Sequence, residues 1–189
     1  MINKNKLGVG LSIALLLILI ITTGISFAFF TANITGVEEQ DTIVLSGGVM
    51  NITYSGGSNI NALNMVPKSS PFGTKTFTVT GNSTANADMN YQVVLYVSQN
   101  TFSNNTIKYK LTSTNTGSNG TVVPSSSGLV GIASGSSREI NLGNGKFVSP
   151  TNGNKVHTYV MEMHFPDSGS NQNQEQGKVF GARILVRGV

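Results

Sequence analysis

The sequence predicts an all-β fold: a jelly-roll-like, two-sheet antiparallel sandwich that follows an N-terminal apolar signal or anchor helix. Three observations predict this fold. Gly, Ser, Thr and Asn make up 83 of the 189 residues, and these residue types favour turns. Aromatic and β-branched residues recur between them in short period-two runs, which are typical of half-buried strands. After residue 30, no window shows the sustained 3.6-residue apolar spacing of a helix.

The composition excludes several classes of protein. Charged residues are only 11% of the chain, which argues against a coiled coil and against a charge-rich disordered tail. The absence of Cys excludes a disulfide scaffold, a thiol nucleophile and a Cys-ligated metal or iron–sulfur centre. We find neither a domain-sized linker nor a repeat of 20–50 residues. A single sandwich domain is therefore expected over residues 42–189.

The N-terminus has the pattern of an export segment. Lys4 and Lys6 precede an uncharged run of 24 residues, from Leu7 to Phe30, and the lysines would stay on the cytoplasmic side. Ser26 and Ala28 place small residues at the −3 and −1 positions of a signal-peptidase site. We therefore expect residues 1–28 to be a signal peptide that is cleaved after Ala28. The alternative is an uncleaved membrane anchor over residues 7–30, because about 20 apolar residues span a bilayer.

Both alternatives place the rest of the chain outside the cell, secreted or at the cell surface. The expected partners during export are signal peptidase and the membrane. After Ala28 the chain carries ten Lys or Arg and eight Asp or Glu, a net charge of +2. No basic stripe with interleaved aromatic residues is present, so nucleic acid is not expected as a partner.

Period-two alternation and turn clusters predict eight to ten strands. The expected strands lie at 43–45, 49–54, 74–80, 91–97, 107–111, 140–142, 159–165 and 179–186, with weaker candidates at 120–123 and 128–133. Residues 55–71 are expected to form a long loop. Gly143-Asn144-Gly145 is expected to be a hairpin turn. Strands at this spacing favour a two-sheet sandwich or jelly roll.

Residues suited to catalysis are few. His157 and His164 are seven apart, so a continuous strand would point them to opposite faces. Glu162 shares a face with His164, but a metal site needs three or four convergent ligands, so we expect ordinary polar positions on a half-exposed strand. No nucleophile elbow, phosphate loop or nucleotide fingerprint is present. The sequence therefore predicts a protein that is not an enzyme, with no catalytic residue, cofactor or metal. A metal-dependent enzyme and a Lys–Asn isopeptide crosslink stay open as alternatives.

Two parts of the chain carry a resemblance to a known family. The N-terminal junction Gly24-Ile25-Ser26-Phe27-Ala28-Phe29-Phe30-Thr31, followed by a short strand ending near Gly47-Gly48, resembles the TasA/camelysin family of exported biofilm-matrix and surface-fibre proteins. Residues 76–79, 90–93, 158–165 and 177–184 are similar to that family in layout. The resemblance implies an apolar signal, a jelly roll and a role as a fibre subunit. The chain has no protease motif, so the peptidase activity attached to camelysin gains no support.

The resemblance also implies a mechanism of assembly. In TasA-like fibres, the N-terminal strand of one mature subunit completes a sheet of the next. Cleavage after Ala28 would free a strand in which Phe30, Ala32 and Ile34 share a face and Phe29 lies opposite. A head-to-tail contact of this kind does not close, so it generates a homopolymer.

Residues 29–41 would then be the donor strand and an acidic joint. Two alternatives for this segment stay open: the end of a membrane helix, or the protein's own edge strand. For the whole chain, the alternative function is a membrane-tethered adhesin or glycan-binding module.

Overall fold

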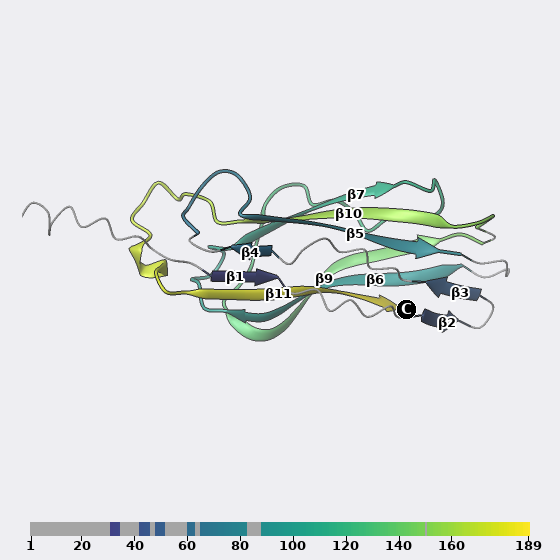
Figure 1. Ribbon diagram of the computed structural model, residues 1–189, viewed down its shortest axis with the longest axis horizontal. Coiled ribbons are helices and arrows are strands. Elements are labelled where there is room, and N and C mark those ends of the chain that lie inside the picture. Colours follow the sequence, from purple (N-terminus) through teal and green to yellow (C-terminus); the bar gives the residue numbers. More distant parts are fainter. Residues whose placement is uncertain are drawn as a thin grey trace, which may run out of the picture.

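A computed structural model describes the backbone of four short strands and the full structure of residues 65–82, 88–149 and 151–189 (Figure 1). The strands are β1 (Thr31–Ile34), β2 (Thr42–Leu45), β3 (Gly48–Asn51), β4 (Ile60–Ala62), β5 (Gly73–Gly81), β6 (Met89–Asn100), β7 (Lys108–Asn115), β8 (Val130–Gly131), β9 (Gly135–Phe147), β10 (Lys155–His164) and β11 (Val179–Gly188). A single 3₁₀ turn, η1 (Asn173–Glu175), is the only helical element in these described parts. Within them, no helix has the length and apolar character needed to cross a membrane.

The strands form two layers that lie face to face (Figure 1). The four-stranded sheet has the order β5-β10-β7-β8, and the five-stranded sheet has the order β4-β1-β11-β6-β9. Strands β2 and β3 form a separate antiparallel pair. The neighbours in the two layers are antiparallel, apart from β1 and β11, which run parallel. The predicted all-β fold with two antiparallel sheets is confirmed, and the parallel pair β1–β11 is a departure from it.

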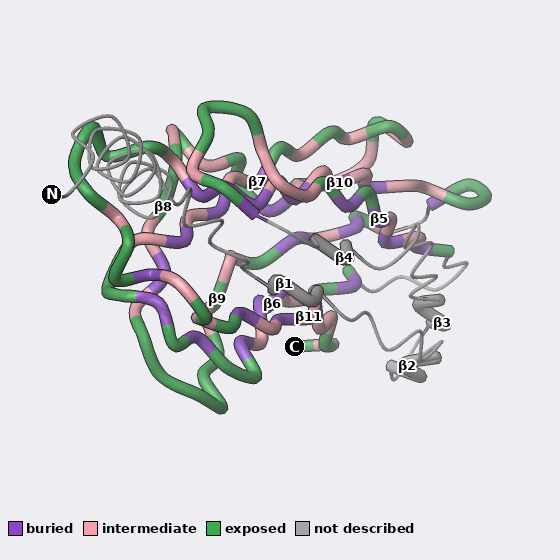
Figure 2. Tube along the Cα trace, turned by 60° about the vertical axis from the view of Figure 1, so that its left-hand side comes forward, coloured by how far each residue is buried: buried purple, intermediate pink, exposed green. Residues whose placement is uncertain are grey.

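The hydrophobic core lies between the two layers, and the period-two pattern of the sequence decides which residues are buried in it. Figure 2 marks the buried residues along the chain. The predicted inward faces are confirmed, since each of their residues is at most 8% exposed. These residues are Phe77 and Val79 in β5, Tyr91, Val93, Leu95 and Val97 in β6, Ile107, Tyr109 and Leu111 at β7, and Tyr159, Met161, Met163 and Phe165 at β10.

The hairpin predicted at Gly143-Asn144-Gly145 is wrong, because all three residues lie within β9. The pairing of β6 with β9 shifts register between Val93 and Val94, and Gly143 has a φ of 135°. Gly143 therefore lies at a β-bulge and Gly145 at a site of close packing, and neither forms a turn. A Cβ on Gly145 would collide with the ring of Tyr91.

Three other boundaries differ from the expected ones. The loop predicted over 55–71 contains β4, and β9 begins at Gly135, five residues before the expected strand. Residues 120–123 form only an isolated bridge between Thr121 and Lys146, and Val123 N–H donates to the hydroxyl of Tyr159 instead of to a neighbouring strand. The export segment lies outside the described residues, including Ser26 and Ala28 of the expected cleavage site.

Candidate functional site

β1, the first strand that the structure describes, occupies an interior place in the five-stranded sheet. β1 pairs in parallel with β11, from Thr31 opposite Val179 to Ile34 opposite Ala182, and antiparallel with β4 on its other side. On its far side β11 pairs with β6. If β1 were withdrawn, β11 would present a free edge of unpaired N–H and C=O groups. We define the place of β1 between β11 and β4 as the β1 slot.

Two of the residues expected to form a donor strand lie in the β1 slot. Ala32 and Ile34 lie in β1, opposite Phe180 and Ala182 of β11. Phe29 and Phe30 lie outside the described residues, and so do the side chains of β1. The backbone alone places the strand between two partners, so within the chain's own sheet it is an interior strand and not an edge strand.

β10 separates the residues considered for a metal site. His157 points into the core and is fully buried, whereas Glu162 and His164 lie on the opposite face of the strand. The Nε2 atom of His164 is 3.7 Å from Oε2 of Glu162, and that carboxylate also pairs with Lys110 at 3.7 Å. His157 and His164 point to opposite faces, as predicted, but both are buried, so the expectation that they are ordinary half-exposed polar positions is wrong. Throughout the described ranges, no three His, Asp or Glu side chains come together to hold a metal ion.

A buried polar cluster joins the two sheets, and the sequence analysis missed it. The hydroxyl of Tyr91 in β6 lies 2.5 Å from Nδ1 of His157 and 2.5 Å from the hydroxyl of Tyr159, both in β10. Val123 N–H donates to the hydroxyl of Tyr159 at 3.1 Å, and Nε2 of His157 lies 2.7 Å from the carbonyl oxygen of Asn119. The signal was present, because His157 has the same parity as the predicted inward-facing residues of its strand.

The backbone groups at its two ends fix the direction of each hydrogen bond in the cluster. A carbonyl only accepts, so Nε2 of His157 carries the proton and donates to Asn119. Nδ1 then accepts from the hydroxyl of Tyr91, which accepts in turn from the hydroxyl of Tyr159. At the other end of the path, Val123 N–H donates to the hydroxyl of Tyr159. Every donor and acceptor along this path is satisfied.

Burial keeps the cluster neutral. Desolvation lowers the pKa of His157 and raises the pKa of both Tyr91 and Tyr159 above the ordinary tyrosine value. The ring of Phe147 stacks on the ring of His157, with 4.0 Å between centroids. The arrangement is a hydrogen-bonded brace between the two sheets.

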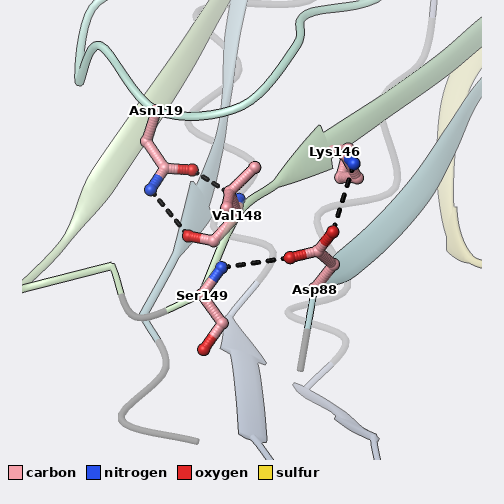
Figure 3. A network of polar contacts seen from close by, with 5 residues as sticks. All are labelled: Asp88, Asn119, Lys146, Val148 and Ser149. Carbon is pink, nitrogen blue, oxygen red and sulfur yellow. Dashed lines mark hydrogen bonds and ion pairs between the residues drawn. The ribbon is translucent and has the colours of Figure 1, made fainter. Parts of the chain in front are cut away.

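Exposed polar contacts hold the Asn119 end of the brace against the end of β9 (Figure 3). Nδ2 of Asn119 donates to the carbonyl of Val148 at 2.8 Å, and Val148 N–H donates to its Oδ1 at 2.6 Å. Lys146 and the backbone N–H of Ser149 both donate to Asp88, and these bonds lower the pKa of that carboxyl. The two bonds to Val148 therefore fix residue 119 beside β9, and its carbonyl oxygen also accepts from Nδ2 of Asn115 at 3.1 Å.

Comparisons with known proteins assign this chain to no family. The chain matches no protein-family model and no curated protein sequence. Among solved structures, a GH26-CBM35 β-(1,4)-mannanase of Podospora anserina is similar at 11% identity and a TM-score of 0.33, over 86% of this chain and 28% of that one. A ruminal GH26 endo-β-1,4-mannanase is similar at 11% identity and a TM-score of 0.27, over 70% of this chain and 24% of that one. The chain thus spans about a quarter of these enzymes' length.

Proposed function

We propose that the protein is an exported structural subunit of an extracellular fibre or biofilm matrix. Subunits would assemble head-to-tail when the N-terminal strand of one copy enters the β1 slot of the next. The observation that carries this proposal is the place of β1: the first described strand is held by main-chain pairing on both edges, far in sequence from β11. An identical strand from another copy could make the same pairing. The resemblance of the N-terminal junction to the TasA/camelysin family supports the same function.

The finer features belong to this proposal. Residues 1–28 act as a signal peptide cleaved after Ala28, and the sandwich has a jelly-roll-like topology. Phe30, Ala32 and Ile34 form one face of the donor strand, with Phe29 on the other. Residues 36–41 act as the joint.

The exchange is energetically feasible, since a donated strand regains in its neighbour the pairing that it leaves in its own subunit. The balance then depends on the joint and on concentration. Only seven residues separate β1 from β2, and short joints favour exchange between copies over return to the same sheet.

Two forms of the protein test the proposal. Protein that begins at Phe29 should polymerise, and protein that lacks residues 29–35 should stay monomeric in analytical ultracentrifugation. Circular dichroism of the deleted form shows whether the sandwich still folds. If it does not, a synthetic peptide of residues 29–35 provides a second test, because it should occupy the β1 slot and stop growth of the full protein. Continued polymerisation of the deleted form would overturn the proposal.

The N-terminal residue of the native protein separates this function from a membrane-tethered adhesin or glycan-binding module. A fibre subunit is expected to begin at Phe29 after cleavage. A tethered module keeps residues 1–28. Intact-mass measurement of protein taken from cells distinguishes the two directly.

A further inference from the structure

The outer face of the four-stranded sheet carries a regular array of β-branched residues. The array has three rows that run across β5, β10 and β7, and we name it the threonine grid. The register places Thr78, Thr158 and Thr114 in the middle row and Thr76, Val160 and Thr112 in one flanking row. In the other flanking row Thr80 lies opposite Val156. Thr116, just beyond the end of β7, completes this row, and its hydroxyl lies 2.9 Å from that of Thr158. Seven of the nine residues are threonine.

The threonine grid is open to solvent and free of charge. Four threonines of the grid, at positions 76, 112, 114 and 116, are exposed, and the other five members are half-buried. Charged side chains begin only in the next row, where Glu162 stands between Thr74 and Lys110. Because β-branched side chains are stiff about χ1, these groups lose little rotational freedom when a partner binds.

The strands beneath the threonine grid are unusually regular for this molecule. β10 pairs with β5 through nine consecutive residue pairs and with β7 through eight, with no shift of register. Residues therefore repeat at about 6.7 Å along each strand and about 4.8 Å across the strands. The five-stranded sheet has two register shifts, so it offers no comparable repeat.

We infer that the threonine grid is a lateral contact surface between copies of this chain, through which neighbouring fibres pack side by side. The inference rests on the proposed function. A threonine hydroxyl both donates and accepts, so a grid of threonines is complementary to a second grid related to it by a two-fold axis. Two copies of a charged face would instead bring like charges together and repel each other. The grid has no aromatic ring on which a sugar could stack, so a second copy fits it better than a glycan.

The size of the threonine grid explains why it would act between fibres and not between single subunits. Nine positions at this spacing cover about 300 Å². A stable protein–protein interface needs about 800 Å² from each partner. Two free subunits would therefore not pair through the grid. A fibre presents one grid on each subunit, and the repeated weak contacts add up through high effective concentration.

The test adds positive charge to the threonine grid without touching the β1 slot. The variant Thr78→Lys/Thr114→Lys puts one lysine on each side of Thr158, so two grids that face each other would repel. The matched control, Asn90→Lys/Asn144→Lys, adds the same charge to exposed positions of the five-stranded sheet. Fibre width is measured by negative-stain electron microscopy, and bundling by low-speed sedimentation.

Wild type and control are expected to form bundles, whereas the grid variant forms single fibres of normal length. Bundling of the grid variant should return in about 1 M salt, where screening reduces the repulsion to a few ångströms' range, and a misfolded variant would not recover in this way. Undiminished bundling of the grid variant at low salt overturns the inference and leaves the fibre proposal standing. Single fibres from wild-type protein also overturn it. Failure of the wild type to form any fibre overturns both.

Discussion

The two sheets of the sandwich are built in different ways. The four-stranded sheet pairs β10 with β5 and β7 in unbroken register, and its outer face carries the threonine grid beside the pair of Glu162 and Lys110. The five-stranded sheet has two register shifts, holds the parallel pair β1–β11, and carries charge outside: Arg187 pairs with Glu139, and Arg183 lies 4.8 Å from the centre of the Tyr96 ring. The difference indicates that the four-stranded sheet is the regular, fixed layer of the sandwich. The irregular sheet takes one strand from the far end of the chain, so exchange of that strand is possible there.

Removal of a large ring where the two sheets meet should have the largest effect on stability. Phe147, at the end of β9, is fully buried and stacks on His157 of β10. Phe147→Ala should lower the free energy of unfolding by about 3–5 kcal/mol, because it removes a buried ring and leaves a cavity. Urea denaturation measures the change. The neighbouring, exposed Val148→Ala is the control and should change it by less than about 0.5 kcal/mol. Equal effects of the two would contradict the packing described.

Breaking the hydrogen-bonded brace should cost less. Tyr159→Phe keeps the ring that stacks on Phe77 but leaves Val123 N–H without its acceptor. We expect a loss of about 1–3 kcal/mol, the cost of a buried unpaired polar group. Tyr109→Phe removes a tyrosine hydroxyl outside the brace and should be nearly neutral in the same denaturation experiment. A neutral Tyr159→Phe would show that the brace does not join the sheets.

The brace should also make stability depend on pH. Because burial lowers the pKa of His157 in the folded protein, the unfolded chain binds more protons just below pH 6.5. Stability should therefore be complete above that pH and fall as pH decreases toward 5, by at most about 1.4 kcal/mol per pH unit. Protonation would give Nδ1 a proton, so the Tyr91 hydroxyl could no longer donate to it. His157→Gln should flatten the profile between pH 7.5 and 5 in thermal unfolding. An unchanged slope would contradict the assignment.

The charged outer face of the five-stranded sheet should contribute least. Arg187 and Glu139 form a bidentate pair that is open to solvent, and the pair lowers the pKa of Glu139. Exposed pairs of this kind gain little, since water and salt screen them. Glu139→Gln should leave the midpoint of thermal unfolding unchanged within error at physiological salt. A clear drop would mean that this outer face supports the fold as much as the core does.

Local patterns in the sequence were sufficient for the body of the sandwich. Alternation at 74–80, 91–97 and 159–165 predicted both the strands and their inward faces, because burial of one face enforces period two. The pattern failed at β9. Gly143 and Gly145 have the composition of a turn, yet they serve a bulge and the close approach of the Tyr91 ring. That requirement comes from a strand more than 50 residues away, so no local window contains it.

The candidate site was predictable only in part. The parity of β10 correctly sent His157 and His164 to opposite faces, but it did not show that His157 would meet Tyr91 from the other sheet. The N-terminal segment was expected to include a strand, and its parallel pairing with β11 depends on contacts between the two ends of the chain. The sequence showed one column of the threonine grid, as the alternating threonines of 74–80. Its rows depend on the register with β10 and β7.

The most direct test of the central claim asks whether β1 pairs within its own subunit or with the next one. Asn33 of β1 lies opposite Asn61 of β4 in an antiparallel pair, and the chain has no cysteine of its own. Directly opposed antiparallel residues lie within the Cα separation that a disulfide requires, so Asn33→Cys/Asn61→Cys should crosslink on oxidation. Gln92→Cys/Asn144→Cys, opposite each other in β6 and β9, is the control and should crosslink only within one chain.

Assembled Asn33→Cys/Asn61→Cys protein, oxidised and run on a non-reducing gel, should give a ladder of covalent multimers that collapses to monomer on reduction. The control should run as a monomer throughout. A crosslinked monomer alone, recovered from fully assembled Asn33→Cys/Asn61→Cys fibres, would show that β1 stays in its own subunit and would contradict strand exchange.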